Sequence, residues 1–258
     1  MSKTIVMFDM DGTLTEPREK FNSKTLSNCL LELSSYAEIG IITGSDEDYL
    51  REQMGDFIAK SSSRYKIHLM PCNGTKYLKP PQSADDDFVL VHEVSMEDHL
   101  GVKKYRQVIQ ELIYSQVDLA NSDVPLTGHF INCRGSTINW SPIGRNAGNS
   151  EREEFVKIDA KLGLRARVLS ELRAILELRK LNNDITVKLG GDTSFDIYPK
   201  GWDKTYGLRH FSDWDIWFVG DRCSPNGNDY EIYESCIGQS YVSSGPDNTA
   251  EIITNIID

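Results

Sequence analysis

The residues with the clearest chemical potential are two aspartates near the N-terminus. Asp9 and Asp11 belong to the segment DMDGT (residues 9–13), which follows the apolar segment IVMF (residues 5–8). An aspartate carboxylate can attack phosphorus to form an aspartyl phosphate, and a second carboxylate nearby can transfer a proton. Asp and Gly in this spacing are also typical of a simple turn. The intact hydrophobic strand before the pair and Thr13 after it favour the catalytic interpretation.

A third aspartate is predicted to join this pair. The apolar residues 216–219 read as a buried strand that ends in Gly220 and Asp221, so Asp221 occupies the same position after its strand as Asp9. The carboxyl ends of parallel strands meet at one edge of a sheet, where α/β proteins bind ligands. Magnesium prefers such oxygen ligands. Asp229 is a further acidic candidate, with capping of a short helix at residues 230–234 as an equal alternative.

Two other side chains suit phosphoryl chemistry. Lys204 follows Gly201-Trp202-Asp203 and could hold Asp9 and balance charge, although a solvated lysine is the ordinary alternative. Ser45 follows a predicted strand at residues 38–42. Its hydroxyl fits either a bond to a transferring phosphoryl group or, with Asp48, a capping box for the next helix. These two interpretations of Ser45 are compatible and equally favoured.

Composition narrows the function classes. The chain has 258 residues and a formal net charge of −11, which argues against nucleic-acid and anionic-membrane partners. Apolar runs are shorter than a membrane span, and the N-terminus lacks the pattern of a signal peptide. The five cysteines show no C-x-x-C spacing, so we expect reduced thiols and a cytoplasmic location.

The order of predicted elements divides the chain into a core and an insertion. Strand, helix and strand signals at residues 5–8, 25–36 and 38–42 predict a parallel α/β core, which resumes near residue 198. A Pro, Ser and Asp-rich stretch at residues 80–87 is predicted to be the linker out of the core. We therefore predict a core of residues 1–81 and 198–258 and an inserted domain of residues 82–197.

The insertion has a different pattern. We expect a strand at 88–94, one long helix at 96–119, a hairpin at 129–133 and 137–140, helices from 150 and over 165–181, and strands at 184–189 and 195–198. Strands followed by paired helices indicate an α+β domain with an antiparallel sheet. Arg134, Arg145 and Arg152 lie around its hairpin and a helix start, where they could clamp a phosphate. Arg152 by itself could instead pair with neighbouring glutamates.

Longer sequence motifs, which together cover nearly the whole chain, resemble those of a known family. The strings DMDGTLTEPR (9–18), PCNG (71–74), SPIGRN (141–146), GGDTSFDIYPKGWDK (190–204) and GDRCSPNGNDYEIYE (220–234) resemble the eukaryotic-type phosphomannomutases of the haloacid dehalogenase (HAD) superfamily. The resemblance implies a Rossmann-like HAD core with an inserted cap that binds the sugar phosphate. The family is usually a dimer formed through the cap.

The resemblance also implies roles for individual residues. Asp9 would be the nucleophile and Asp11 the acid and base, with Mg²⁺ on Asp9, the Asp11 backbone and Asp221. The implied substrate contacts are Arg18, Arg134, Arg145, Arg152, Ser194 and Asp196. The expected reaction interconverts mannose 6-phosphate and mannose 1-phosphate, primed by a hexose 1,6-bisphosphate, and supplies mannose 1-phosphate for GDP-mannose synthesis. A sugar phosphatase, a phosphoglucomutase and a non-enzymatic sugar-phosphate-binding protein remain alternatives.

The sequence departs from the family pattern in a few places. Thr43 replaces the first glycine of the family's G-G-S-D motif, and Arg222-Cys223 replaces Lys-Thr after the third aspartate. Ser235 stands where an acidic residue is common. The second, structural cation that the family holds near Asp229, Tyr233 and Ser235 is for this reason not predicted here.

Overall fold

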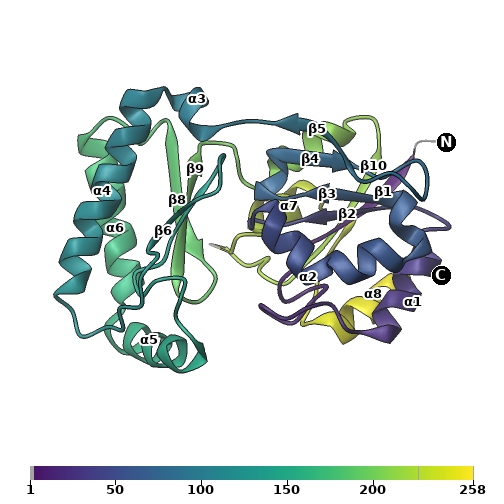
Figure 1. Ribbon diagram of the computed structural model, residues 1–258, viewed down its shortest axis with the longest axis horizontal. Coiled ribbons are helices and arrows are strands. Elements are labelled where there is room, and N and C mark those ends of the chain that lie inside the picture. Colours follow the sequence, from purple (N-terminus) through teal and green to yellow (C-terminus); the bar gives the residue numbers. More distant parts are fainter. Residues whose placement is uncertain (1–2, 226, 258) are drawn as a thin grey trace. The chain divides into compact units, whose positions relative to one another are not determined.

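The computed structural model describes residues 3–225 and 227–257, and its contacts divide the chain into two units (Figure 1). The core unit comprises Met1–Glu93 and Trp202–Asp258, and the cap unit comprises Val94–Gly201. Residues 1, 2, 226 and 258 of the predicted core lie outside the described residues.

The core unit is built on a mainly parallel sheet, as predicted. Its strand order is β11-β10-β1-β2-β3-β4-β5. The parallel strands are β1 (Thr4–Phe8), β2 (Glu38–Ile42), β3 (Ile67–Met70), β10 (Asp215–Gly220) and β11 (Ser240–Val242). Antiparallel β4 (Lys76–Lys79) and β5 (Val89–Glu93) extend one edge. Strand β1 therefore lies inside the sheet, between β2 and β10.

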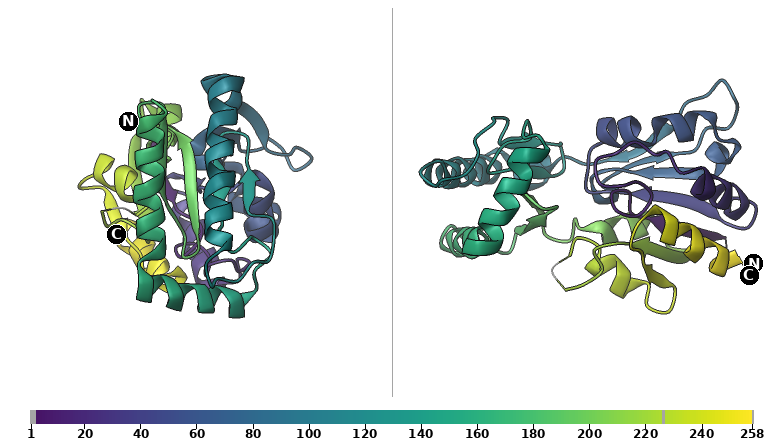
Figure 2. Two further views of the ribbon diagram at one scale, coloured as in Figure 1. Left: turned by 90° about the vertical axis from the view of Figure 1, so that its left-hand side faces the viewer. Right: turned by 90° about the horizontal axis from the view of Figure 1, so that it is seen from below.

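The apolar residues of β1 are buried on both faces of this sheet. Val6 and Phe8 pack into a cluster with α1 (Lys24–Leu33), α2 (Glu47–Lys60) and α8 (Pro246–Ile257). Ile5 and Met7 pack into a second cluster, which includes residues of the 3₁₀ helix η3 (Lys204–Phe211) and of α7 (Tyr230–Ser235). Figure 2 shows helical segments on both sides of the core sheet. Burial on both faces accounts for the unbroken apolar run at residues 5–8.

The boundary between the units differs from the predicted one because the strand at Val89–Glu93 belongs to the core. It pairs with β4 in antiparallel register, with Lys76 opposite Glu93. The Pro and Asp-rich stretch after residue 80 is thus the loop of a hairpin within the core sheet. Strand β4 has only four residues and was not predicted, so nothing in the sequence pattern supplied a core partner for β5.

The start of α2 also corrects a prediction. The side chain of Asp46, not Ser45, caps this helix by accepting a hydrogen bond from the backbone N of Tyr49 at 3.0 Å. Ser45 is held one residue earlier, where its backbone N donates to Thr43 Oγ1 and its carbonyl accepts from Cys72 N. The predicted capping box of Ser45 and Asp48 is therefore wrong.

The cap unit contains the expected antiparallel sheet, in the order β6-β7-β9-β8. Its strands are β6 (Ile131–Cys133), β7 (Ile138–Trp140), β8 (Ile185–Gly190) and β9 (Ser194–Pro199). Its helices are α3 (Met96–Leu100), α4 (Val102–Ala120), α5 (Asn149–Leu162) and α6 (Leu164–Leu178). Helices α4 and α6 contact each other and lie on the same face of the sheet (Figures 1 and 2).

One predicted cap helix is broken into two. Gly101 adopts φ +76°, which a right-handed helix does not allow, and it separates α3 from α4.

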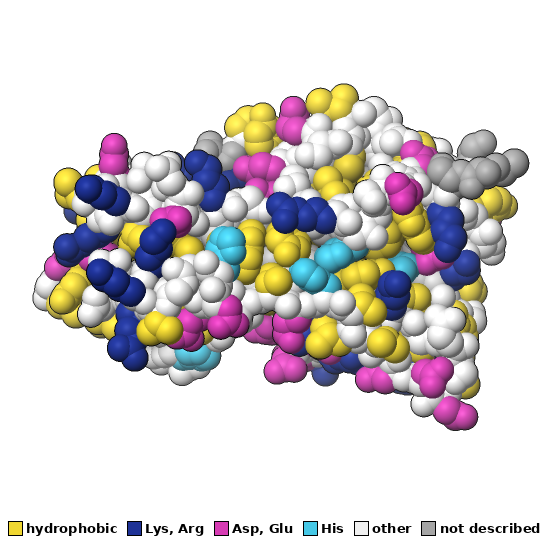
Figure 3. All heavy atoms as spheres, turned by 90° about the horizontal axis from the view of Figure 1, so that it is seen from above, with side chains coloured by type: hydrophobic (Ala, Val, Ile, Leu, Met, Phe, Trp, Pro, Cys, Tyr) yellow, Lys and Arg dark blue, Asp and Glu magenta, His cyan; other side chains and the backbone are white. Residues whose placement is uncertain are grey.

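On the surface of the cap seen in Figure 3, Lys and Arg side chains are interspersed with acidic and apolar ones. None of the helices formed by the described residues is long and apolar enough to cross a membrane.

We predict that Gly74→Ala destabilises the core unit, whereas Gly55→Ala does not. Gly74 has φ +82°, and a Cβ there would lie 2.5 Å from the Cα of Gly207. The expected loss is about 1–3 kcal/mol in the free energy of unfolding. A Cβ at Gly55, within α2, meets no atom within 4 Å, so alanine there should stabilise the helix by up to about 1 kcal/mol. Urea denaturation measures both changes, and equal stability of the two variants would contradict the prediction.

Candidate active site

Asp9 lies immediately after β1, at the carboxyl edge of the parallel sheet. Its backbone N donates to the carbonyl of Val219 at 2.9 Å, which ties the end of β1 to the neighbouring strand β10. The chain then turns sharply, and the carbonyl of Met10 accepts hydrogen bonds from Leu14 N and Thr15 N. The side chain of Asp9 is almost fully buried. The turn thus directs a carboxylate into the protein rather than into solvent.

Asp9, Asp221 and Asp229 form a compact carboxylate cluster. One oxygen from each of the three lies within 4.8 Å of the others. Asp221 follows β10, so the pairing of β1 with β10 brings two residues together that are far apart in sequence. Gly12, with φ +86°, packs directly on the carboxylate of Asp221, and any Cβ at this position would overlap it. The turn after β1 therefore requires glycine both for its backbone conformation and for the close approach of Asp221.

Lys204 lies at the centre of this cluster. Its Nζ donates to Oδ1 of Asp9 and to Oδ1 of Asp229, and its side chain is 1% exposed. Burial alone would lower the pKa of Lys204, but the adjacent carboxylates of Asp229 and Asp9 outweigh burial and raise it. The predicted contact between Lys204 and Asp9 is thus present, and Lys204 is not a solvated surface lysine.

The cluster carries more negative than positive charge. Burial raises the pKa of Asp9 well above its usual value, and the charges of Asp229 and Asp221 act in the same direction, although Lys204 opposes them. Burial and the neighbouring Asp229 likewise raise the pKa of Asp221 to about 6. One buried ammonium and the partly exposed guanidinium of Arg222 do not balance three ionised carboxylates, so the cluster favours an added cation.

The donor set fits a magnesium ion. Asp221 Oδ1 is buried and has no hydrogen-bond partner among the described residues, so this carboxylate oxygen can serve as a metal ligand. Oxygen ligands from one or two carboxylates are typical of magnesium sites that also bind phosphate. Asp9 and Asp221, both predicted as ligands, are brought together here. Asp229 joins them through the shared Lys204.

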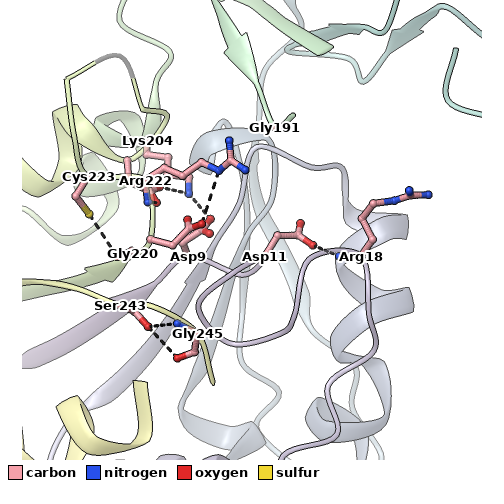
Figure 4. A network of polar contacts seen from close by, with 12 residues as sticks. Asp9, Asp11, Arg18, Gly191, Lys204, Gly220, Arg222, Cys223, Ser243 and Gly245 are labelled. Carbon is pink, nitrogen blue, oxygen red and sulfur yellow. Dashed lines mark hydrogen bonds and ion pairs between the residues drawn. The ribbon is translucent and has the colours of Figure 1, made fainter. Parts of the chain in front are cut away.

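The side chain of Asp11 lies outside this cluster. Its Oδ1 accepts hydrogen bonds from the backbone N of Arg18 at 2.9 Å and from the hydroxyl of Tyr49 at 3.0 Å. Figure 4 shows the Asp11 carboxylate directed toward Arg18, beside Asp9 but apart from the carboxylates around Lys204. Arg18 itself is exposed and has φ +65°. Asp11 is thus held in a second position, suited to proton transfer, and only its backbone is a candidate for the metal.

The capping alternative for Asp229 does not hold. Its side chain makes no capping hydrogen bond to α7. Instead, Oδ1 accepts from Lys204 and Oδ2 accepts from the backbone N of Arg222 at 3.1 Å, with the residue fully buried. Asp229 therefore orients Lys204 and the segment that carries Asp221.

Ser45 lies in a loop that is fixed by its neighbours. Thr43 is buried, and its carbonyl accepts from the backbone N of Asn73, while Cys72 N donates to the carbonyl of Ser45 at 2.7 Å. Ser45 follows β2, the other parallel neighbour of β1. With the capping role taken by Asp46, contact with a phosphoryl group stays as the prediction for the Ser45 hydroxyl.

The cap unit gathers most of its predicted substrate residues around one asparagine. The amide of Asn139, on β7, donates to Ser194 Oγ at 3.0 Å and to Asp196 Oδ1 at 2.8 Å, and its Oδ1 accepts from Arg145 Nη1 at 3.0 Å. Gly190 leaves space for the Asp196 carboxylate, since a Cβ at Gly190 would come within 2.5 Å of it. Asn139 thereby sets the positions of an arginine in the segment after β7 and of a hydroxyl and a carboxylate on β9.

Arg152 and Arg134 are held in different ways. Arg152 Nη1 donates to Thr193 Oγ1 at 2.9 Å and Nε donates to the carbonyl of Ala147, which links α5 to the turn before β9. Arg134 lies in the turn between β6 and β7, where its backbone N donates to the carbonyl of Thr137. Arg145 and Arg152 thus both reach the segment 193–196, directly or through Asn139.

Sequence reasoning missed Tyr49, Asn139 and Thr193. Asn139 carried a usable signal, because a polar residue between the apolar Ile138 and Trp140 in a strand must point to the opposite face. Tyr49 carried none, since its contact with Asp11 joins residues 38 positions apart.

Comparison with known proteins assigns this arrangement to a family. The profile of the eukaryotic phosphomannomutase family matches residues 26–258. The chain belongs to this family. A phosphomannomutase from Arabidopsis thaliana is 37% identical over 249 residues, covering 95% of this chain and 93% of the relative. One from Dendrobium officinale is 36% identical over 253 residues, covering 97% and 93%. Phosphomannomutase activity, an isomerase reaction, follows from this full-length similarity.

Solved structures support the fold. The Plasmodium falciparum IMP-nucleotidase bound to IMP superposes with a TM-score of 0.66 at 14% identity, covering 99% of this chain and 68% of the other. An Aspergillus fumigatus trehalose-6-phosphate phosphatase gives 0.53 at 16% identity, covering 99% and 92%. At such identities the likeness concerns the fold alone, and the phosphomannomutase assignment depends on the family match.

We predict that Mg²⁺ stabilises the protein through Asp221. At a concentration 100 times its dissociation constant, a bound ion adds about 2.7 kcal/mol to the free energy of unfolding, so the melting temperature should rise on titration. Asp221→Asn should abolish most of this rise, because it removes charge from the buried, unpartnered oxygen. Asp213→Asn, at an exposed site, is the control with the same change. An equal rise in the Asp221 variant would place the ion elsewhere.

Proposed function

We propose that the chain interconverts mannose 6-phosphate and mannose 1-phosphate by carrying a phosphoryl group on Asp9. The observation that supports this most directly is the contact of Lys204 with Asp9 inside a cluster of carboxylates, with Asp11 held separately beside it. A buried carboxylate whose charge is partly balanced by an ammonium is a nucleophile prepared for phosphorus. In this proposal Asp11, which accepts hydrogen bonds from Tyr49 and Arg18, moves the proton.

The proposed cycle has two phosphoryl transfers. In the first, the bond between the Asp9 oxygen and phosphorus breaks, a sugar hydroxyl oxygen bonds to phosphorus, and the hydroxyl proton passes to Asp11. The hexose bisphosphate then reverses its orientation in the site. In the second, the other sugar oxygen–phosphorus bond breaks, Asp9 regains the phosphoryl group, and Asp11 returns the proton to the sugar oxygen. A hexose 1,6-bisphosphate supplies the phosphoryl group that first loads Asp9.

Magnesium bound by Asp9, Asp221 and the Asp11 backbone would add the positive charge that the transferring phosphoryl group needs. The remaining roles fall to this chain's side chains. Lys204 holds the Asp9 oxygen and is itself oriented by Asp229. Ser45 and Arg18 contact the reacting end of the substrate from the core. These residues orient the phosphoryl group while it is transferred.

The cap binds the end of the substrate that is not reacting. Arg145 and Arg152 suit a phosphate, because a guanidinium binds phosphate in a bidentate fashion. Ser194 and Asp196, fixed by Asn139, suit sugar hydroxyls. Arg134 adds a further basic group in the same unit. Excluding water from the loaded Asp9 is what separates a mutase from a phosphatase.

The proposal extends to the setting of the reaction. We place the enzyme in the cytoplasm, where the mannose 1-phosphate it forms is used for GDP-mannose synthesis. We also propose a homodimer formed through the cap. Helix α4 supports it, because Ile113, Tyr114 and Val117 form an apolar strip there that is 48%, 61% and 58% exposed, respectively. Their spacing places them on one side of the helix.

Phosphorus NMR tests the reaction. With Mg²⁺ and a hexose 1,6-bisphosphate, mannose 6-phosphate should give a new 1-phosphate resonance. Inorganic phosphate as the sole product would indicate a phosphatase, no change would indicate a binding protein, and faster conversion of glucose 6-phosphate would indicate a phosphoglucomutase. Asp9→Asn should abolish turnover, and Asp11→Asn should lower kcat by roughly 10²- to 10⁴-fold. Asp213→Asn is the matched control, and full activity of Asp9→Asn would rule out the covalent route.

Analytical ultracentrifugation tests the dimer. Ile113→Glu together with Val117→Glu should shift the protein to a monomer, because two carboxylates in an apolar interface lose their hydration. Leu178→Glu, at an 82% exposed position on α6, should leave the dimer intact. A wild-type monomer at micromolar concentration, or a dimer that survives the double substitution, would exclude this interface.

A further inference from the structure

Arg222 lies directly beside the carboxylate cluster. It follows Asp221, and its Nε lies 3.7 Å from Asp221 Oδ2. Its backbone is fixed, because its N donates to the buried carboxylate of Asp229 at 3.1 Å. Its side chain is 38% exposed, whereas that of Lys204 is 1% exposed. The base of the side chain is therefore fixed beside the cluster, and the side chain as a whole is partly exposed.

The negative charge around a phosphorylated Asp9 requires a further cation, which Arg222 can supply. Asp9, Asp221 and Asp229 carry three negative charges when ionised, and Lys204 with one divalent cation balances them. A phosphoryl group on Asp9 adds further negative charge that this balance does not cover. Lys204 is already engaged with Asp9 and Asp229. A loaded Asp9 thus needs another cation close by.

The position of Arg222 matches this need. Figure 4 shows its guanidinium beside the group of carboxylates that includes Asp9, on the same side as the Lys204 ammonium, and its ion-pair contact there is with Asp221. The guanidinium of Arg18 lies on the far side of Asp11 in the same view. Guanidinium groups bind two oxygens of a phosphate at once, which holds the group's orientation as well as its charge.

We propose that Arg222 binds the oxygens of the phosphoryl group carried on Asp9 and holds them during transfer. This rests on the proposed aspartyl-phosphate mechanism and adds a phosphoryl-binding residue to it. Arg222 forms and breaks no covalent bond and moves no proton. The competing explanation is that Arg222 only neutralises Asp221 and so adjusts the affinity for the metal.

Orthovanadate distinguishes these explanations, because it imitates a phosphoryl group in transfer. Its dissociation constant is measured with saturating Mg²⁺ in wild type, Arg222→Gln and Arg222→Lys. Loss of a charge-assisted bidentate contact should weaken vanadate binding roughly 10- to 100-fold in Arg222→Gln. Arg222→Lys, which keeps the charge but loses the fork, should fall between. Arg209→Gln, an exposed arginine of the core unit that lies over Tyr206, is the matched control and should bind vanadate as wild type does.

The Mg²⁺ affinity of each variant, from thermal denaturation, provides the second readout. The proposal expects Arg222→Gln to keep the Mg²⁺-dependent stabilisation while it loses vanadate affinity. Unchanged vanadate binding, or a loss fully explained by weaker Mg²⁺ binding, would overturn it. If Arg222→Gln does not fold, Arg222→Lys decides alone, and vanadate affinity equal to wild type overturns the proposal.

Labelling separates this proposal from the mechanism beneath it. Wild type treated with a ³²P-labelled hexose 1,6-bisphosphate should carry an acid-stable, hydroxylamine-sensitive label that Asp9→Asn lacks. With the label present, an unchanged vanadate affinity in Arg222→Gln rejects only the role of Arg222. With no label in wild type, the covalent mechanism fails and the role of Arg222 fails with it.

Discussion

The ion-pair bridge from Lys204 to Asp9 and Asp229 is the interaction on which the site depends. All three groups are buried, and a buried charge is tolerated only when it is paired and hydrogen-bonded. The bridge joins the end of β1 to the start of η3 and the residue before α7, so it ties together three segments that are distant in sequence. Removing the ammonium would leave uncompensated carboxylates in the core, which is far more costly than losing an exposed salt bridge.

The bridge has its place because of how the sheet is ordered. Parallel pairing of β1 with β10 puts Asp9 and Asp221 at the same edge, and pairing with β2 adds the loop that carries Ser45. Close packing completes the arrangement: Gly12 lies against Asp221, and Gly220 lies against Asp229. In both cases a side chain would displace a carboxylate. The glycines of the two motifs are therefore as necessary to the geometry as the aspartates themselves.

In our proposal, each of the two units recognises a different part of the sugar phosphate. The core supplies the carboxylates, the lysine and, in our proposal, Arg222, all suited to the group in transfer. The cap supplies Arg145 and Arg152 with the hydroxyl and carboxylate that Asn139 positions. Buried polar groups that are fully hydrogen-bonded, as Asn139 is, hold their neighbours in one geometry. This explains why a polar residue lies inside a strand of the cap sheet.

Local patterns of apolar residues and turn residues were enough to predict the parallel core, the antiparallel cap and the position of Asp9 at the end of its strand, because neighbouring residues express these features directly. The same position after a buried strand indicated Asp221, and the need for a cation near the carboxylates indicated Lys204. Tertiary structure decided what no local pattern holds. Strand Val89–Glu93 belongs to the core because β4 pairs with it. Asp46 caps α2, because contacts with Thr43 and Cys72 hold Ser45 outside the cap position. Tertiary structure also decided that Asp229 is an ion-pair partner of Lys204 rather than a helix cap, since that contact exists only once η3 and α7 are packed on the sheet.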